Sequence, residues 1–324
     1  MATSASGLQV SSALEAFAAG YTNGAMIADK ICPIIMHEGI NGTYHYRSRT
    51  ETGTIYEDLT GDDSEPNEIT VGDSTATFTA LARSLSGLVP YAKIDNADDP
   101  LRPKEQTLAL VLNDLLIAEE RRVSVALHNT ANYLAANTAA AGNLWSSVAN
   151  GTPVSDIQQM IRTVAPGMDG NSKLVMQIGI EAAQALSRHP EMLGLRAGGG
   201  TKSGVVTMDE IVTAFDKLDE IWVTDSEYVT TMRGQTPTYA KIWDKAKVVL
   251  ARVPKTEPRG VEGQSLLCAR FRWTSPSQAP MSVYEFDEPN RGAGKGSVRV
   301  KASHWTSVPT IIQNDQGYLL TTVV

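Results

Sequence analysis

The chain has 324 residues, of which 42% are hydrophobic, and a formal net charge of -8. A chain of this length can bury a substantial core, and it predicts two domains or one large elaborated domain. Residues 1–25 lack the basic region and continuous apolar run of a secretion signal, and no stretch approaches the ~18–20 apolar residues of a membrane span. The composition therefore predicts a soluble, globular protein of the cytoplasm.

The charge is distributed unevenly along the chain. Residues 1–240 hold 16 basic and 29 acidic side chains, a net charge of -13, whereas residues 241–301 hold 12 basic and 6 acidic side chains, a net charge of +6. Two interpretations remain open at this point. The difference is either ordinary surface charge, or the basic part meets nucleic acid or an acidic segment of another copy.

The N-terminal quarter reads as an arm followed by a hairpin. Residues 1–24 are small and polar, which is typical of an arm that orders only against another surface. An apolar segment interrupted by Pro33 follows, and then strand-favouring residues flank positions 55–74 on both sides. Residues 55–74, named here the acidic finger, hold seven acidic side chains and no Lys or Arg. We expect them to project from the core on a long hairpin.

A long helix is the strongest local prediction, over residues 104–135. Apolar side chains recur at spacings of three and four and give one apolar face. The helix would be roughly 45–50 Å long. A coiled coil is less well supported, because regular charges at the flanking heptad positions are absent. The apolar face consists of Leu108, Val111, Leu112, Leu115, Leu116, Val123, Ala126, Leu127, Thr130 and Leu134.

Helical and strand patterns alternate over residues 153–253, which predicts an α+β or α/β layer. A helix opens there with Ser155 and Asp156 as expected caps, and a later one has Thr207 at its start. The rest of the chain is nearly all strand, and no fixed-period repeat is present.

The sequence contains little that indicates catalysis or metal binding. The five histidines have no metal-ligand spacing, and no nucleophile-elbow motif is present. The glycine-rich segments at residues 197–204 and 291–297 lack the spacing of nucleotide-binding loops. Cys32 and Cys268 are far apart without a CxxC partner, which favours buried free thiols over a disulfide or zinc site. We predict no catalytic, cofactor-binding or metal-binding residues and no enzymatic activity.

Four segments in order carry a resemblance to a known family. They read IADKICPIIMHEGINGTYHYRSR, DNADDP with LLIAEERRVSVALHNTANYL behind it, SDIQQMIRTVAPGMDGNSKLVMQIGIEAAQALSRHPEMLG, and PTYAKIWDKAKVVLARVP. Together they span most of the chain, which resembles the major capsid proteins of tailed bacteriophages. The resemblance implies an α+β fold with an N-terminal arm, an extended β-hairpin loop, a long spine helix with a peripheral sheet, and an α/β axial domain.

The resemblance also implies a division of the chain. It places the arm and the segment leading out of it at 1–40, the extended loop at 41–85, the peripheral domain with spine helix 104–135 at 86–152 and 254–303, and the axial domain at 153–253 and 304–324.

The implied function is that of a structural protein of the virion. The chain would self-assemble through a procapsid, as pentamers and hexamers, into an icosahedral or prolate head around double-stranded DNA. Its expected partners are other copies of itself, a portal protein, a separate scaffolding protein, a decoration protein and nonspecifically held DNA, with assembly in the host cytoplasm and no membrane. Only about 100 residues precede the spine helix, so we expect no maturation cleavage, and the acidic finger has no lysine for a covalent link.

Two alternatives stay open. An encapsulin-like compartment looks similar but houses enzymes, and a groove for cargo peptides would distinguish it. A cytoplasmic α/β enzyme would need a convergent polar site, which the sequence does not show.

The charge pattern and the resemblance together give a hypothesis for the interface between subunits. In capsids of this type the extended loop lies across a neighbouring copy, so the acidic finger would lie over a neighbour's basic residues. The acidic set is Glu57, Asp58, Asp62, Asp63, Glu65 and Glu68. The basic candidates are Arg121 and Arg122 of the helix and Lys255, Arg259, Arg270, Arg272, Arg291, Lys295 and Arg299 of the basic stretch.

Overall fold

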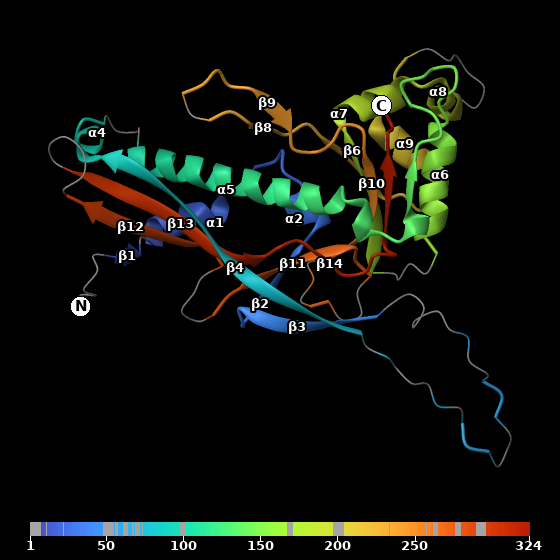
Figure 1. The fold of residues 1–324 in the computed structure, drawn as a ribbon, viewed down its shortest axis with the longest axis horizontal. Helices are drawn as coiled ribbons and strands as arrows, with labels where there is room; N and C mark the ends of the chain where they lie inside the picture. The colour runs from blue at the N-terminus through green and yellow to red at the C-terminus, as the bar shows by residue number, and fades with distance from the viewer. Residues whose placement is uncertain are drawn as a thin grey trace.

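A long helix, α5, joins two β-sheets in the computed structural model (Figure 1). The larger sheet lies along one side of α5, and the smaller sheet with its helices stands at the C-terminal end of α5. The described residues are 8–10, 12–21, 23–47, 55, 58–60, 64–66, 68, 72, 74–97, 102–166, 171–196, 204–232, 234–256, 258, 260–261, 265–275, 280–289 and 296–324.

The larger sheet has eight strands and is covered by helices on one face. Alternate residues of β12 and β13 form an apolar layer with one stripe of α5 and with α1, which buries the shared side chains. Its strands are β1 (Leu8–Val10), β2 (Ile34–His37), β3 (Asn41–Tyr46), β4 (Ser74–Pro90), β11 (Cys268–Trp273), β12 (Ser282–Glu288), β13 (Ser297–Ser307) and β14 (Thr310–Ile311). The helices beside it are α1 (Ser12–Gly20), α2 (Ala28–Ile31), α4 (Tyr91–Asp95) and α5 (Pro103–Leu127).

The predicted hairpin around the acidic finger is present. Strand β3 pairs antiparallel with Ser74–Thr79 of β4, and β4 then continues along β13 to Pro90. The described residues between β3 and β4 are exposed, and Figure 1 shows them extending away from the rest of the chain. Strand β4 ends at Pro90, because helix α4 begins at Tyr91.

The smaller sheet confirms the alternation predicted over residues 153–253. Its central strands are buried along their length and carry helices around them. Its strands are β5 (Thr138–Ala140), β6 (Ser172–Gly179), β7 (Glu220–Thr224), β10 (Val248–Pro254) and β15 (Gly317–Thr321), and the separate ribbon is β8 (Glu227–Val229) with β9 (Tyr239–Lys241). Its helices are α6 (Pro153–Val164), α7 (Ile180–Arg188), α8 (Pro190–Arg196) and α9 (Met208–Ala214).

Two helix starts test the predicted caps. Thr207 caps α9 in a capping box with Glu210, as predicted. The prediction of Ser155 and Asp156 as caps was wrong: α6 begins at Pro153 and Thr152 precedes it. Pro at the first helical position loses no hydrogen bond there, so the helix starts two residues earlier. Asp156 instead accepts a hydrogen bond from the indole of Trp145 at 2.9 Å.

Helix α5 ends at Leu127, eight residues before the predicted end, so it is about 37 Å long. Beyond the end of the helix, asparagine side chains form hydrogen bonds with backbone groups. Asn132 donates to the carbonyl of Ala126 at 2.7 Å, and Asn129 accepts from the N–H of Ala131 at 3.1 Å. Two short 3₁₀ turns, η1 (Thr130–Asn132) and η2 (Ala135–Asn137), follow in place of the last two helical turns.

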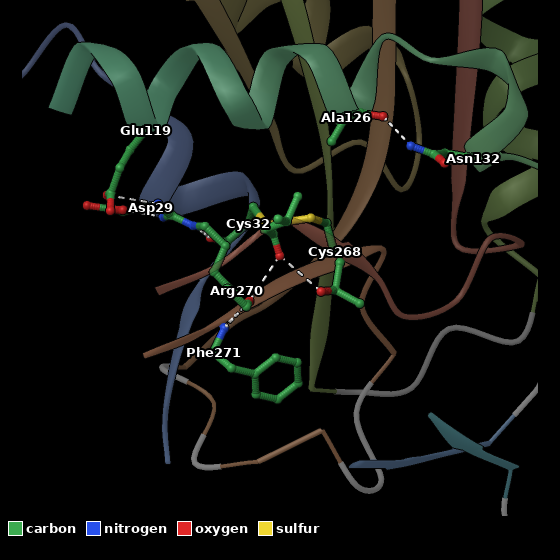
Figure 2. Close-up of a disulfide and its surroundings, with 11 residues drawn as sticks. Asp29, Cys32, Glu119, Ala126, Asn132, Cys268, Arg270 and Phe271 are labelled. Carbon is green, nitrogen blue, oxygen red and sulfur yellow. Dashed lines mark hydrogen bonds and ion pairs between the residues drawn. A yellow bond between two sulfur atoms is a disulfide. The ribbon is translucent and has the colours of Figure 1, made fainter. Parts of the chain in front are cut away.

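The prediction of two free thiols was also wrong, because Cys32 and Cys268 form a disulfide (Figure 2). Strand β2 pairs in parallel with β11, with Ile34 opposite Arg270, and this pairing brings the two cysteines to a Cα–Cα distance of 4.9 Å. The 236-residue separation concealed this contact, since a parallel strand pair leaves no local sequence signal. The disulfide ties the segment behind the N-terminal arm to the larger sheet.

Reduction of this disulfide is expected to lower the free energy of unfolding by about 2–5 kcal/mol, because the crosslink restricts the unfolded chain. Urea unfolding with and without a thiol reductant measures the difference. The double variant Cys32→Ser/Cys268→Ser is the control, and its unfolding midpoint should not respond to reductant. Equal midpoints for the oxidised and reduced wild-type protein would contradict the expectation.

Candidate assembly surfaces

The described part of the chain contains no arrangement that indicates catalysis. Within it, no group of His, Cys, Asp and Glu side chains could hold a metal ion, and no helix is long and apolar enough to cross a membrane. Residues 197–203 and 291–295 of the glycine-rich segments lie outside the described residues. The polar side chains that stand out instead form a buried cluster under α5 and several exposed surfaces around it.

Glu119 is the centre of the buried cluster. It projects from α5 toward the larger sheet, where Arg270 Nη1 donates to its Oε2 at 3.0 Å and Arg272 Nη2 donates to its Oε1 at 3.2 Å. From β13, His304 Nε2 lies 2.7 Å from Oε1. Arg270 also donates to Asp29 and to the carbonyl of Cys32, so that one guanidinium joins α5, α2 and β11 (Figure 2).

This environment keeps Glu119 ionised. Burial by itself would raise the pKa of the carboxyl group, but the close contact with His304 and the charges of Arg270 and Arg272 outweigh burial and hold that pKa below its usual range. A depressed pKa means that the cluster contributes stability above the unfolded pKa of a glutamate, roughly 4.3, and loses it as the pH falls. The cluster is therefore intact at neutral pH.

Glu120, the next residue, joins three other parts of the chain. Its side chain accepts hydrogen bonds from the N–H groups of Ile27 and Ala28, at 3.1 and 2.8 Å, and from Trp243 Nε1 at 2.7 Å. Burial raises the pKa of Glu120, and these hydrogen bonds oppose the rise. Through this one side chain, α5 holds both the segment behind the arm and the loop that precedes β10.

The basic residues of the interface hypothesis fall into two groups. Arg270 is buried and Arg272 nearly so, and both pair with Glu119 of their own chain. Arg121 is exposed, with its guanidinium 4.7 Å from the centroid of the Tyr228 ring, and Arg122 Nη2 lies 4.0 Å from Glu119. Arg270 and Arg272 are therefore not available to another copy, whereas Arg121 at the surface of α5 is.

The remaining members of the hypothesis are placed as follows. Asp58, Glu65 and Glu68 are exposed and have no ion-pair partner in the described chain. Lys255 is exposed, and Arg299 pairs with Glu288 at 2.6 Å. The other members lie outside the described residues: Glu57, Asp62, Asp63, Arg259, Arg291 and Lys295.

Glu119 and Glu120 were not identified as functional residues from the sequence. A usable signal was present. Glu119 lies four residues after Leu115 and four before Val123, so it falls on the apolar stripe of the helix. A charged residue in phase with the buried face requires a buried partner, and the basic pair on β11 provides it.

Comparisons with known proteins agree with this architecture. No family model matches the chain. It is 27% identical over 232 residues to a curated major capsid protein of Pseudomonas phage JBD67, covering 71% of this chain and 73% of that protein. Among solved structures, a phage-related protein from Bordetella bronchiseptica matches 97% of each chain with a TM-score of 0.73 and 17% identity. The capsid structure of cyanophage P-SCSP1u matches 94% of this chain and 91% of that one, with a TM-score of 0.58 and 10% identity.

Replacing Glu119 by Gln should destabilise the subunit by about 3–5 kcal/mol, because two buried guanidiniums lose their counter-charge. The matched control is Glu120→Gln, which removes a neighbouring carboxylate that pairs with neutral donors and should cost about 1–3 kcal/mol. Urea unfolding of the two purified subunits at pH 7 compares them. An equal or smaller loss for the Glu119 variant would contradict the assignment of the cluster as the main electrostatic contact.

Proposed function

We propose that this chain is a major capsid protein of a tailed bacteriophage and that it forms the head that encloses the genome. It is a structural component of the virion shell, without enzymatic activity, and many copies assemble with one another. The observation that carries this assignment is the 27% identity to a phage major capsid protein over 71% of the chain, joined to a fold that phage capsid structures share.

The finer partners are part of the proposal. We propose pentamers and hexamers, assembly in the host cytoplasm with a portal protein and a separate scaffolding protein, and a head around double-stranded DNA. The net charge of -8 opposes sequence-specific DNA binding, so contact with DNA is weak and salt-sensitive. A decoration protein would bind the finished shell from outside.

The four-part division of the chain belongs to the proposal as well. Two separate sheets support a peripheral part around α5 and an axial part around β6 and β10. The strand pairings extend beyond the proposed boundaries in several places. Strand β13 remains in the larger sheet to Ser307, β14 (Thr310–Ile311) pairs with β11 of the same sheet, and β5 (Thr138–Ala140) belongs by its pairing with β15 to the smaller sheet.

The acidic finger is proposed to lie across a neighbouring subunit. Its described acidic side chains have no ion-pair partner among the residues that the structure describes, and its apolar side chains Ile55 and Leu59 are 96% and 81% exposed. The finger buries none of these side chains against its own subunit, so it gains no free energy of burial there. A second copy provides the surface that can bury them.

Size-exclusion chromatography and negative-stain microscopy of the purified chain, expressed alone and with candidate scaffolding proteins of the same phage, test the assignment. The expected result is closed shells of megadalton mass. A protein that remains monomeric or dimeric under all of these conditions would reject it.

Neutralising the described part of the finger should weaken assembly without unfolding the subunit. The variant Asp58→Asn/Glu65→Gln/Glu68→Gln is expected to keep the melting temperature of the subunit, since exposed ion pairs contribute only about 0–1 kcal/mol each. Its shells should form in lower yield and dissociate at lower salt, because the contact repeats in every copy.

The matched control neutralises three exposed acids on the helices of the smaller sheet, Glu181→Gln/Glu191→Gln/Asp209→Asn, with the same change in net charge. Shell yields and salt tolerance that fall equally in both variants would mean that net charge, and not the finger, governs assembly.

A further inference from the structure

One edge of the eight-stranded sheet is open along residues 81–90 of β4, beyond Ala80, whose N–H donates to the carbonyl of Ile40 at 2.7 Å. Strand β13 occupies one side of this segment, β3 pairs only with Ser74–Thr79, and no other strand of the described chain pairs with β4. At the opposite edge of the sheet, β12 is covered by β1 from the arm. Because an uncovered edge strand presents unpaired N–H and C=O groups, residues 81–90 form a template for a further strand.

One face of this open edge carries Arg83, and Arg122 of α5, which lies 4.0 Å from Glu119, is beside that face. Gly87 marks the face toward α5, since a Cβ there would lie 2.3 Å from Thr107 Cγ2, and Arg83 shares that face by alternation. The Nε atom of Arg83 is buried without a hydrogen-bond partner. Burial lowers the pKa of Arg122 on α5, and the charge of Arg83 lowers it further. Arg83 and Arg122 are thus near enough for their charges to interact beside α5.

The other face of the same edge is also basic. Lys301 and Arg299 of β13 line a groove there with Ser84 and Ser86 of β4. Arg299 pairs with Glu288, but Lys301 has no ion-pair partner in the described chain. Because the two serines are short, a side chain arriving at the free edge of β4 can reach the ammonium group of Lys301 across them.

Apolar side chains complete the surface. Leu81, Leu85 and Leu88 are 45%, 42% and 40% exposed, although they belong to one strand of a packed sheet. The acidic finger offers the complementary set in its exposed Ile55 and Leu59 and in its unpaired carboxylates. The edge and the finger therefore match in charge, in apolar surface and in their extended form.

We propose that the acidic finger of a second copy adds as a strand to the free edge of β4, with carboxylates against Arg83 and Arg122 on one face and Lys301 on the other. The inference rests on the proposed function, since it requires an assembled shell, and it names the docking edge on the neighbouring subunit. Backbone hydrogen bonds hold the added strand, and the cations select an acidic segment.

Engineered cysteine pairs test the position of the finger. The only native cysteines are joined to each other, so new thiols react without competition. Ser84→Cys on β4 is combined with Asp58→Cys, Glu65→Cys or Glu68→Cys in separate variants, and assembled shells are treated with oxidised glutathione. At least one pair should give dimers and higher multimers on a non-reducing denaturing gel. The matched control pairs the same finger cysteines with Ser155→Cys, an exposed position on α6.

Charge exchange provides a second measurement. Arg83→Glu should cause a severalfold loss of shell yield, and adding Glu65→Lys or Glu68→Lys should recover part of it, while Lys93→Glu, an exposed change on α4, should have little effect. A loss that no finger lysine recovers would mean that Arg83 acts only within its own subunit.

The outcomes separate the two levels of the proposal. Failure of the wild-type chain to form shells rejects the proposed function. Well-formed shells without finger-to-β4 crosslinks overturn the docking edge and leave the function intact. Crosslinks confined to single chains would show the finger folded onto its own β4. Crosslinks from Ser4→Cys of the arm, with none from the finger, would assign the edge to a neighbour's arm instead.

Discussion

The contact between Glu119 and the arginines of β11 fixes how α5 lies on the larger sheet. A buried carboxylate must meet its partners at hydrogen-bonding distance, so the helix can neither rotate nor slide without leaving charge unpaired. Glu120 then uses this fixed helix to hold the segment behind the arm and the loop around Trp243. Two adjacent residues of one helix thereby set the relative positions of arm, sheet and axial part.

This internal pairing also determines which charges remain for other molecules. The basic stretch of the sequence suggested a basic surface, but Arg270 and Arg272 form ion pairs with Glu119 inside the subunit. Among the described residues, the basic side chains beside the free edge of β4 form a local set, with Arg83 of β4 on one face of the sheet and Lys301 of β13 on the other. A local set can distinguish an acidic strand from other ligands, whereas a uniformly basic surface would attract any polyanion.

Much of the architecture could be predicted because it depends on local sequence patterns. The α5 stripe, the hairpin at the acidic finger and the helix capped by Thr207 each have a period or a cap that a single segment reveals. The disulfide, the end of α5 and the role of Glu119 depend on contacts between distant segments, or on side chains that replace backbone partners. The acids of the finger could be located from sequence, whereas Arg83 could not, because its importance comes from an edge that appears only once β13 has paired with β4.

An open strand edge is a hazard for a protein that must stay unassembled until its shell forms. Arg83 on the free edge of β4 limits that hazard, because an inward-facing charge opposes pairing with a strand that brings no acid. The finger is restrained in the same way, since seven carboxylates repel one another and prevent it from collapsing onto apolar surface. Each element is unfavourable alone and favourable with the other. The same charges that keep single subunits apart can thus specify the contact between them, and weak pairs repeated in every copy leave room for errors to dissociate.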